Sequence, residues 1–327
     1  MKQILDEAIK ADYGVGAFNV NNMEQIQGIM RAASETASPV ILQASRGALK
    51  YTNMVYIKYL VAAACEDNPT IPISLHLDHG NSFETCKIAI ELGFTSVMID
   101  GSLKEDAKTP TTFDENVEVT KKVADYAHKF GVTVEGELGT LGGIEDGVGS
   151  GKVKLTDPDE AVKFVEITGI DALALAIGTS HGAYKFKAEP KLALDIISEV
   201  SDRLKNFPLV MHGSSSVPHE LIDIINKYGG NMQKTMGVPI ESIQQAIKRG
   251  IRKINIDTDG RLAMTGAVRK YLSQNLDVFD PRKYFGKARE AVYEMVKGKM
   301  ISFGTTGHAG DYKHATLEDI KKVYEKR

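Results

Sequence analysis

The stretch IPISLHLD (71–78) is an apolar run that ends in a carboxylate, and His79 follows it directly. Seven other runs share this apolar, β-branched character, and the eight runs are nearly continuous in apolar residues instead of alternating cleanly with polar ones. Such runs are typical of parallel strands that are covered by helices. The other seven predicted strands are VGAFNV (15–20), PVILQAS (39–45), TSVMIDG (95–101), VTVEGEL (132–138), DALALAIG (171–178), PLVMHGS (208–214) and RKINIDT (252–258).

Segments with a helical repeat separate these strands. Apolar residues between Met23 and Ala33 recur at spacings of three and four, which predicts one stripe for packing onto a sheet. A second helix is predicted from Asp157, whose side chain can cap it, with Glu160 completing a capping box. This helix is expected to end at Gly169, because glycine tolerates the left-handed conformation of a helix end.

The number of strand–helix pairs predicts the architecture. Eight pairs fill the chain through about residue 274, and roughly 250 residues is typical of a (β/α)8 barrel. The length of 327 residues alone suggests about two domains, but the count favours a single α/β domain over 1–327. We expect a TIM barrel at about 1–280, a glycine-rich loop at 139–151 and a helical C-terminal extension at about 281–327. An open doubly wound sheet has the same alternation and stays an alternative.

Composition excludes several classes of protein. The chain has 40 Lys and Arg against 43 Asp and Glu, a net charge of −3, which argues against a nucleic-acid binder. No apolar run approaches the roughly 18 residues of a membrane span. Asp6 and Glu7 stand where a signal peptide needs an apolar core. With only Cys65 and Cys86 there is no disulfide framework. A soluble cytoplasmic protein is therefore expected.

Polar side chains follow the predicted strands at their carboxyl ends, which form the active-site face of a barrel. Three of them are histidines from three different strands, His79, His181 and His212. Three imidazoles suit Zn²⁺, with the fourth position open for water or substrate. Each histidine taken alone is more typical of a hydrogen-bonded core residue than of a metal ligand, and it is their position at three strand ends that favours a metal site. His76 competes with His79, and we interpret it as a core or supporting residue.

Two carboxylates are candidates for proton transfer. Asp78 adjoins His79 and would move a proton on a substrate hydroxyl. Glu145 lies in the loop GTLGGIEDGVGSG (139–151), whose glycines suit a lid that closes over bound substrate. A lid glutamate can serve as the base for a carbon acid. An exposed loop with an incidental acidic residue explains Glu145 equally well.

Candidate phosphate-binding residues cluster late in the chain. The serine run 214–216 follows Gly213 and precedes Pro218, a predicted helix start. Loops after the seventh and eighth strands of a barrel often bind phosphate. Lys185 and Arg261 follow the sixth and eighth strands and add positive charge. The chain lacks a GxGxxG motif after the first strand and a Walker motif, which disfavours nucleotide cofactors.

Five motifs in order make the chain similar to a known family: LHLDHG (75–80), ELGTLGGIEDG (137–147), GTSHGAYK (178–185), MHGSSSVP (211–218) and NIDTDGRLA (255–263). It resembles the class II, zinc-dependent fructose-1,6-bisphosphate aldolases of the type called class IIB. The resemblance runs from YGVGAFNVNN (13–22) to GHAGDYK (307–313), nearly the whole chain. It implies reversible aldol cleavage of fructose 1,6-bisphosphate to dihydroxyacetone phosphate and glyceraldehyde 3-phosphate, a step of glycolysis and gluconeogenesis.

The resemblance also implies roles for individual residues. His79, His181 and His212 would be zinc ligands, and Glu137 would contact the metal when it withdraws to an inner position. Asp78 would handle the proton of the C4 hydroxyl, and Glu145 would take a proton from dihydroxyacetone phosphate. Residues at substrate and phosphate positions are Ser45, Gly182, Lys185, Gly213, Ser215, Asn255, Asp257, Thr258 and Arg261. A monovalent cation (Na⁺ or K⁺) and a homodimer or homotetramer are implied as well.

Three alternatives stay open. A tagatose-1,6-bisphosphate aldolase shares the scaffold and differs in C4 stereochemistry. A metal-free Schiff-base aldolase needs a lysine at a strand end that points inward, whereas Lys253 is predicted at the start of the last strand. A sugar-phosphate-binding protein without catalysis needs neither proton-transfer group, so the pair Asp78 and Glu145 argues against it.

Overall fold

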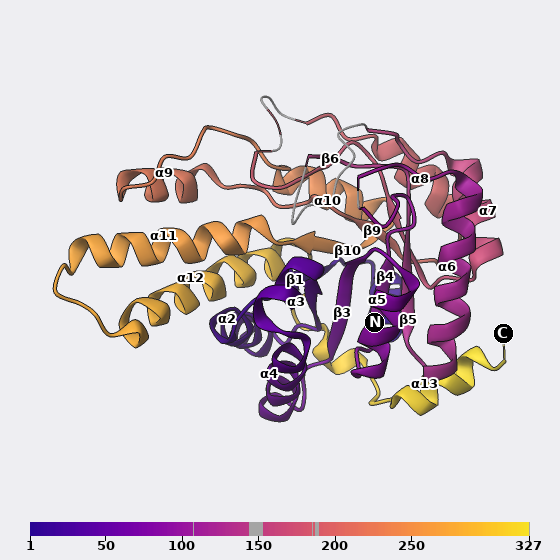
Figure 1. The fold of residues 1–327 in the computed structure, drawn as a ribbon, viewed down its shortest axis with the longest axis horizontal. Coiled ribbons are helices and arrows are strands. Elements are labelled where there is room, and N and C mark those ends of the chain that lie inside the picture. Colours follow the sequence, from indigo (N-terminus) through magenta and orange to yellow (C-terminus); the bar gives the residue numbers. More distant parts are fainter. Residues whose placement is uncertain (107, 144–152, 185, 187–189, 327) are drawn as a thin grey trace.

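A closed barrel of eight parallel strands forms the centre of the molecule (Figure 1). The computed structural model describes residues 1–106, 108–143, 153–184, 186 and 190–326. All eight predicted strands are confirmed, and closure excludes the open doubly wound sheet. Around the barrel the strands run β1 (Val15–Asn19), β10 (Ile251–Ile256), β9 (Leu209–Met211), β7 (Ala172–Leu175), β5 (Thr133–Leu138), β4 (Ser96–Ile99), β3 (Ile73–Gly80) and β2 (Val40–Ser45).

Helices cover the outer face of the barrel and follow the strands along the chain (Figure 1). Two short strands, β6 (Gly142–Gly143) and β8 (Ser180–His181), pair with each other outside the barrel sheet. The helices are α1 (Lys2–Ala11), α2 (Met23–Glu35), α3 (Arg46–Thr52), α4 (Met54–Asp67), α5 (Phe83–Glu91), α6 (Phe113–Ala127), α7 (Pro158–Thr168), α8 (Leu194–Arg203), α9 (His219–Lys227), α10 (Ile240–Lys248), α11 (Thr258–Gln274), α12 (Pro281–Ser302) and α13 (Leu317–Tyr324), with short 3₁₀ turns η1 (His128–Phe130) and η2 (His308–Asp311).

Local sequence sets the ends of α7 largely as predicted. The Asp157 side chain accepts hydrogen bonds from the backbone N–H groups of Asp159 and Glu160, and Gly169 ends the helix at φ 67°. The predicted capping box is wrong in one respect, because the Glu160 carboxylate does not complete it. That carboxylate accepts instead from Nζ of Lys154 at 3.3 Å. Asp157 already satisfies two N–H groups of the first turn.

The barrel separates two regions of packing. Small apolar residues such as Ala17 and Ala174 fill the amino-terminal half of its interior, and α1 packs against them. Larger side chains pack between the strands and the outer helices. In β3, β5 and β10 the apolar side chains face the helices, whereas alternate side chains are polar and meet inside the barrel. These three strands therefore alternate, contrary to the expectation of continuous apolar strands.

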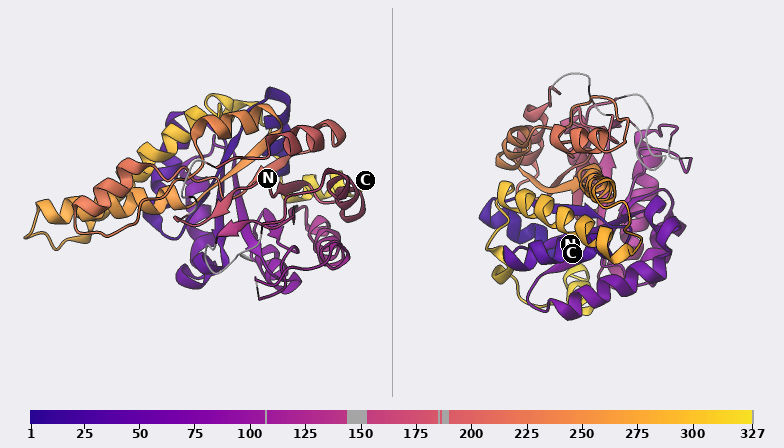
Figure 2. Two further views of the ribbon diagram at one scale, coloured as in Figure 1. Left: turned by 90° about the horizontal axis from the view of Figure 1, so that it is seen from above. Right: turned by 90° about the vertical axis from the view of Figure 1, so that its left-hand side faces the viewer.

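Three helices form an arm that extends to one side of the barrel (Figure 1; Figure 2, left). The arm consists of α9, α11 and α12, and α12 also packs along α2. The C-terminal extension is largely helical, as expected: α12 is followed by η2 and then by α13, which lies against η1. There the ring of Tyr324 stacks on His128 at 3.8 Å, and its hydroxyl donates to Asp171. Among the described residues, no helix is both long and apolar enough to cross a membrane.

Candidate active site

Three histidines meet at the carboxyl end of the barrel. His79 lies near the end of β3, His181 is on β8 and His212 follows β9. Nε2 of His79 and Nδ1 of His212 are 2.9 Å apart, and candidate ligand atoms of all three rings lie within 4.8 Å of one another. All three side chains are buried. The structure therefore brings together the three histidines that the strand ends predicted, with their nitrogen atoms converging on one point.

Carboxylates surround His79 on its other side. Nδ1 of His79 lies 3.1 Å from Oδ2 of Asp100 and 3.9 Å from Oε2 of Glu137. Burial alone would lower the pKa of His79, but the charges of Asp78, Asp100 and Glu137 outweigh burial and raise this pKa to about 10. Oε2 of Glu137 is buried and has no hydrogen-bond partner among the described residues. Such a carboxylate oxygen beside an imidazole suits a bound cation.

Glu137 forms a second candidate ligand group with His79 and Asp100. Burial, together with the negative charge of Asp100, raises the pKa of Glu137 well above its usual value. A metal ion near these atoms would add positive charge beside the carboxylates of Asp100 and Glu137. The backbone of His79 is also unusual, with φ 50° in the left-handed region that residues other than glycine rarely adopt.

Asp78 lies beside the histidines within a set of amide groups. Its Oδ2 accepts from Nδ2 of Asn19 at 3.0 Å and from Nε2 of Gln43 at 3.4 Å. Its Oδ1 accepts from Nδ2 of Asn255 at 3.2 Å. All three partners are donors, which matches a carboxylate that acts only as an acceptor. The sequence predicted Asp78 and Asn255 here, but Asn19 and Gln43 were missed, although each is a polar residue within an apolar run.

Sequence reasoning also missed a buried ion pair below the histidines. Glu135 and Lys253 are fully buried, and Nζ of Lys253 lies 2.9 Å from Oε2 of Glu135. The other oxygen of Glu135, Oε1, lies 2.8 Å from Nε2 of His212. Burial, with the positive charges of His79 and Lys253, lowers the pKa of His212 well below its usual value. This lowered pKa favours the neutral imidazole, which is the form that binds metal.

A spacing of two residues would have revealed this pair. Glu135 precedes Glu137 by two residues and Lys253 precedes Asn255 by two, so each pair shares one face of its strand. Lys253 was predicted at the start of the last strand, away from the site, but its ammonium reaches the barrel interior and donates to Oδ1 of Asn255 at 2.8 Å. An ammonium held in an ion pair is not the free amine that a Schiff base requires.

His76 has the supporting role expected for it. Its side chain is fully buried, Nδ1 pairs with the hydroxyl of Ser96 at 2.7 Å, and Nε2 lies 3.6 Å from Oε2 of Glu135. The ring therefore lies one layer below the three histidines. It is not a member of either candidate metal-binding group.

The predicted phosphate-binding residues after β9 and β10 lie side by side. The backbone N–H of Asp257 donates to the hydroxyl of Ser215 at 3.3 Å. Arg261 binds Asp257 through two hydrogen bonds, of which Nε to Oδ1 is 2.7 Å. Thr258 is buried at the first position of α11. The Arg261 side chain is 41% exposed, so its guanidinium is oriented by Asp257 and still reaches solvent.

The remaining predicted residues are at neighbouring strand ends. Ser45 is the last residue of β2, pairs in register with Asp78 and caps α3. Gly182 and Gly213 have positive φ values of 79° and 61°. A Cβ on Gly213 would lie 2.6 Å from the carbonyl oxygen of Ser180, so this loop packs closely on β8. Two predicted residues, Glu145 and Lys185, lie outside the described residues.

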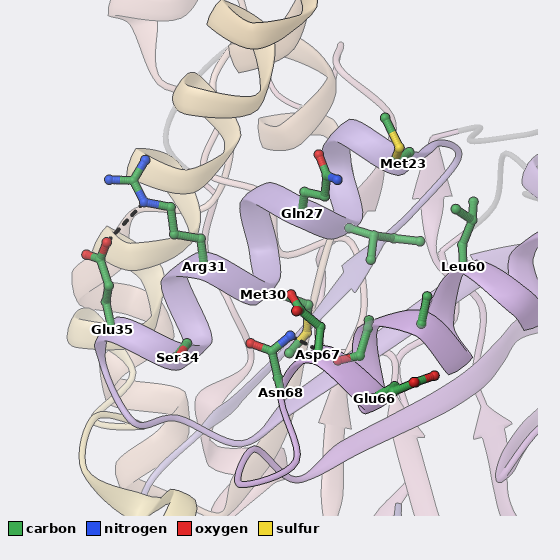
Figure 3. Close-up of a pocket in the computed structure, with 13 residues that line it drawn as sticks. Met23, Gln27, Met30, Arg31, Ser34, Glu35, Leu60, Glu66, Asp67 and Asn68 are labelled. Atoms are coloured by element: carbon green, nitrogen blue, oxygen red, sulfur yellow. Dashed lines mark hydrogen bonds and ion pairs between the residues drawn. The ribbon is translucent and has the colours of Figure 1, made fainter.

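A groove of about 900 Å³ lies elsewhere, on the outer face of the barrel between α2 and α4 (Figure 3). Met23, Met30 and Leu60 contribute to its lining, and an ion pair of 3.0 Å between Arg31 and Glu35 stands at one end. None of the predicted site residues lines this groove. The chemistry is therefore expected at the barrel mouth and not in the groove.

Comparisons with known proteins agree on one protein family. The profile of the family described as "Fructose-bisphosphate aldolase class-II" matches residues 1–308. The chain is 58% identical to a fructose-bisphosphate aldolase of Giardia intestinalis, covering 99% of this chain and 98% of that one, and 52% identical to one of Pseudomonas aeruginosa, covering 99% and 96%. Among solved structures it is similar to the YdjI aldolase of Escherichia coli K12, with a TM-score of 0.75 at 31% identity over 94% of this chain and 98% of that one.

The contacts of Glu135 predict that it supports metal binding through His212. Replacing Glu135 with Gln keeps the shape but removes the charge that faces Lys253, and His212 loses the carboxylate that orients it. We expect the Kd for a divalent metal to rise about 10- to 100-fold, measured by competition with a chromogenic chelator. Glu241→Gln, at an exposed position on α10, is the control and should bind metal like the wild type. An unchanged Kd in Glu135→Gln would remove Glu135 from this role.

Proposed function

Because this chain belongs to the class II fructose-bisphosphate aldolase family, we propose that it is a carbon–carbon lyase that reversibly cleaves fructose 1,6-bisphosphate to dihydroxyacetone phosphate and glyceraldehyde 3-phosphate. The observation that carries the proposal is the cluster of His79, His181 and His212 directly beside Asp78 at the barrel mouth. Binding of a sugar phosphate alone needs no such combination of metal ligands and proton acceptor. Among the described residues of the site, no contact favours tagatose 1,6-bisphosphate.

The donor set favours Zn²⁺ as the metal. Three imidazoles with an open fourth position are typical of catalytic zinc. His79, His181 and His212 would hold the metal, since one candidate ligand atom of each ring lies within 4.8 Å of the others. When bound, the metal supplies Lewis acidity that polarises the substrate oxygens and stabilises negative charge. The proposal also includes Glu137 as an inner ligand and a monovalent cation, Na⁺ or K⁺, beside the phosphate-binding loop.

The protein's own residues then move the protons. In cleavage, Asp78 takes the proton of the C4 hydroxyl, and Asn19, Gln43 and Asn255 hold its two oxygens in place for that transfer. The C3–C4 bond breaks, and the carbon left with the electron pair receives a proton from Glu145. In condensation the same steps run in reverse, so Glu145 removes the proton and Asp78 returns one.

Phosphate groups would be held by the strand-end loops. Gly213 and Ser215 contribute a backbone N–H and a hydroxyl, and Arg261 contributes a planar cation that Asp257 orients. Ser45, Gly182, Lys185, Asn255 and Thr258 complete the proposed contacts to the substrate. This distribution over several loops fits a substrate with a phosphate at each end.

Metal removal tests the central claim. Exhaustive chelation should abolish cleavage of fructose 1,6-bisphosphate, and added Zn²⁺ should restore it. The reason is that a Lewis acid stabilises the negative charge that develops when the C3–C4 bond breaks. The measurement is a coupled assay of triose phosphate release, with kcat/KM on tagatose 1,6-bisphosphate determined in parallel. Activity that survives chelation and is lost on borohydride treatment with substrate would instead support a Schiff-base enzyme.

Removing either proton-transfer group should lower turnover while substrate still binds. For Asp78→Ala and for Glu145→Ala we expect kcat to fall about 10²- to 10⁴-fold, with metal content unchanged by elemental analysis. Binding of fructose 1,6-bisphosphate is followed by calorimetry. The exposed Asp202→Ala on α8 serves as control and should match the wild type. A wild-type kcat in either variant would dismiss that residue from the mechanism.

We also propose that the protein is a homodimer or homotetramer that assembles through the arm. Leu276 and Phe279, in the turn between α11 and α12, are 90% and 91% exposed, and such side chains at the tip of a projecting arm are typical of contact surfaces. A double replacement of both residues by Glu should shift the mass in sedimentation toward the monomer. Ile301→Glu, at the other end of α12, should not. A wild type that sediments as a monomer would refute the proposal.

A further inference from the structure

Two buried charged residues meet next to the phosphate-binding loop, and the reaction described above does not use them. Asp259 lies in the first turn of α11 and is fully buried, and Lys299 lies near the end of α12 and is 5% exposed. Oδ2 of Asp259 and Nζ of Lys299 are 2.8 Å apart. Lysine is rarely buried without a specific partner, so this pair calls for a structural reason.

The pair binds the loop that follows β9. Oδ1 of Asp259 accepts from the backbone N–H of Val217 at 2.7 Å, and Oδ2 accepts from the backbone N–H of Ser216 at 2.9 Å. Nζ of Lys299 donates to the hydroxyl of Ser216 at 2.7 Å. Two consecutive backbone groups and one side chain of the loop are therefore fixed by one ion pair.

The conformation of the loop needs such support. Val217 has φ 48°, in the left-handed region that β-branched residues strongly disfavour. A conformation of this kind persists only where surrounding contacts impose it. The hydrogen bond from Val217 to Asp259 is such a contact, and it acts two residues after Ser215 and four after Gly213, the proposed phosphate-binding residues.

The charge of Lys299 matters as much as its hydrogen bond. Asp259 alone would place a buried negative charge beside a site that binds phosphate, and like charges close together in a poorly solvated region repel strongly. Lys299 neutralises this carboxylate. Asp259 can therefore hold the loop through its oxygens without repelling an anionic ligand.

We propose that Asp259 and Lys299 are positioning residues for phosphate binding, which fix Ser216 and Val217 so that Gly213 and Ser215 face the phosphate group of the substrate. This inference rests on the proposed function, which assigns the loop to phosphate. It gives the C-terminal extension a role in substrate affinity, because Lys299 belongs to α12 and not to the barrel.

The test compares Lys299→Met with Lys297→Met. Lys297 lies two residues earlier on α12, 35% exposed and paired with Glu35, so its loss should leave ligand binding unchanged. For Lys299→Met we expect the Kd for dihydroxyacetone phosphate, measured by calorimetry on the metal-loaded protein, to rise about tenfold, as the loss of a charged hydrogen bond allows. KM for the sugar bisphosphate should rise similarly, with kcat and metal content close to wild type.

Hydrogen exchange provides a readout that is independent of activity. The amides of Ser216 and Val217 should exchange faster in Lys299→Met, and Lys299→Arg should restore slow exchange and affinity. If Lys299→Met does not fold, the double variant with Asp259→Asn removes both charges together and should show the same increase in Kd. Wild-type Kd and KM in a folded variant would overturn the inference. A wild-type protein that does not turn over the sugar bisphosphate would instead overturn the proposed function.

Discussion

The carboxylate of Glu135 holds together the polar half of the barrel interior. One oxygen faces the ammonium of Lys253 and the other faces His212, so a single buried group links a cation to a candidate metal ligand. Leaving either partner uncompensated in this interior would cost several kcal/mol. Hydrogen bonds connect this contact to the rest of the site, because Lys253 donates to Asn255, which in turn contacts His212 and Asp78. The barrel thus fixes its reactive groups from below.

The surroundings of the histidines favour a cation, whereas the loops beyond them favour an anion. Asp78, Asp100 and Glu137 crowd around His79, and the oxygen of Glu137 closest to it has no hydrogen-bond partner among the described residues. A few residues away, the partly exposed guanidinium of Arg261 lies beside the serine loop, and the buried Lys299 neutralises Asp259 there. A net charge of −3 conceals this separation. A substrate whose oxygens bind metal and whose ends carry phosphate matches both halves of the site.

The fold and the upper layer of the site could be predicted from the sequence. The supporting layer was missed, although Glu135 and Lys253 left a signal in their two-residue spacing from Glu137 and Asn255. Apolar runs showed the eight strands, and because strand ends converge in any barrel, His79, His181 and His212 could be grouped without knowing a distance. Glu135 and Lys253 lie inside the strands, where the neighbouring apolar residues obscure the alternation of polar and apolar side chains. Asp259 and Lys299 depend on how α12 packs against the barrel, a contact between distant parts of the chain with no local pattern. The predicted capping role of Glu160 was wrong because Asp157 alone satisfies the helix end.

Helix α12 is one continuous rod from the tip of the arm to the phosphate loop. Its 22 residues begin just after Phe279 and carry Lys299 three residues before their end. Successive residues of an α-helix are related by a rotation of about 100° about the helix axis. Inserting or deleting one residue in α12 would therefore rotate Lys299 away from Asp259. The arm can change in length only by steps close to whole helical turns. The length of the arm and the position of the ligand-binding loop are therefore coupled, because both depend on the helical rotation of α12 that places Lys299 beside Asp259.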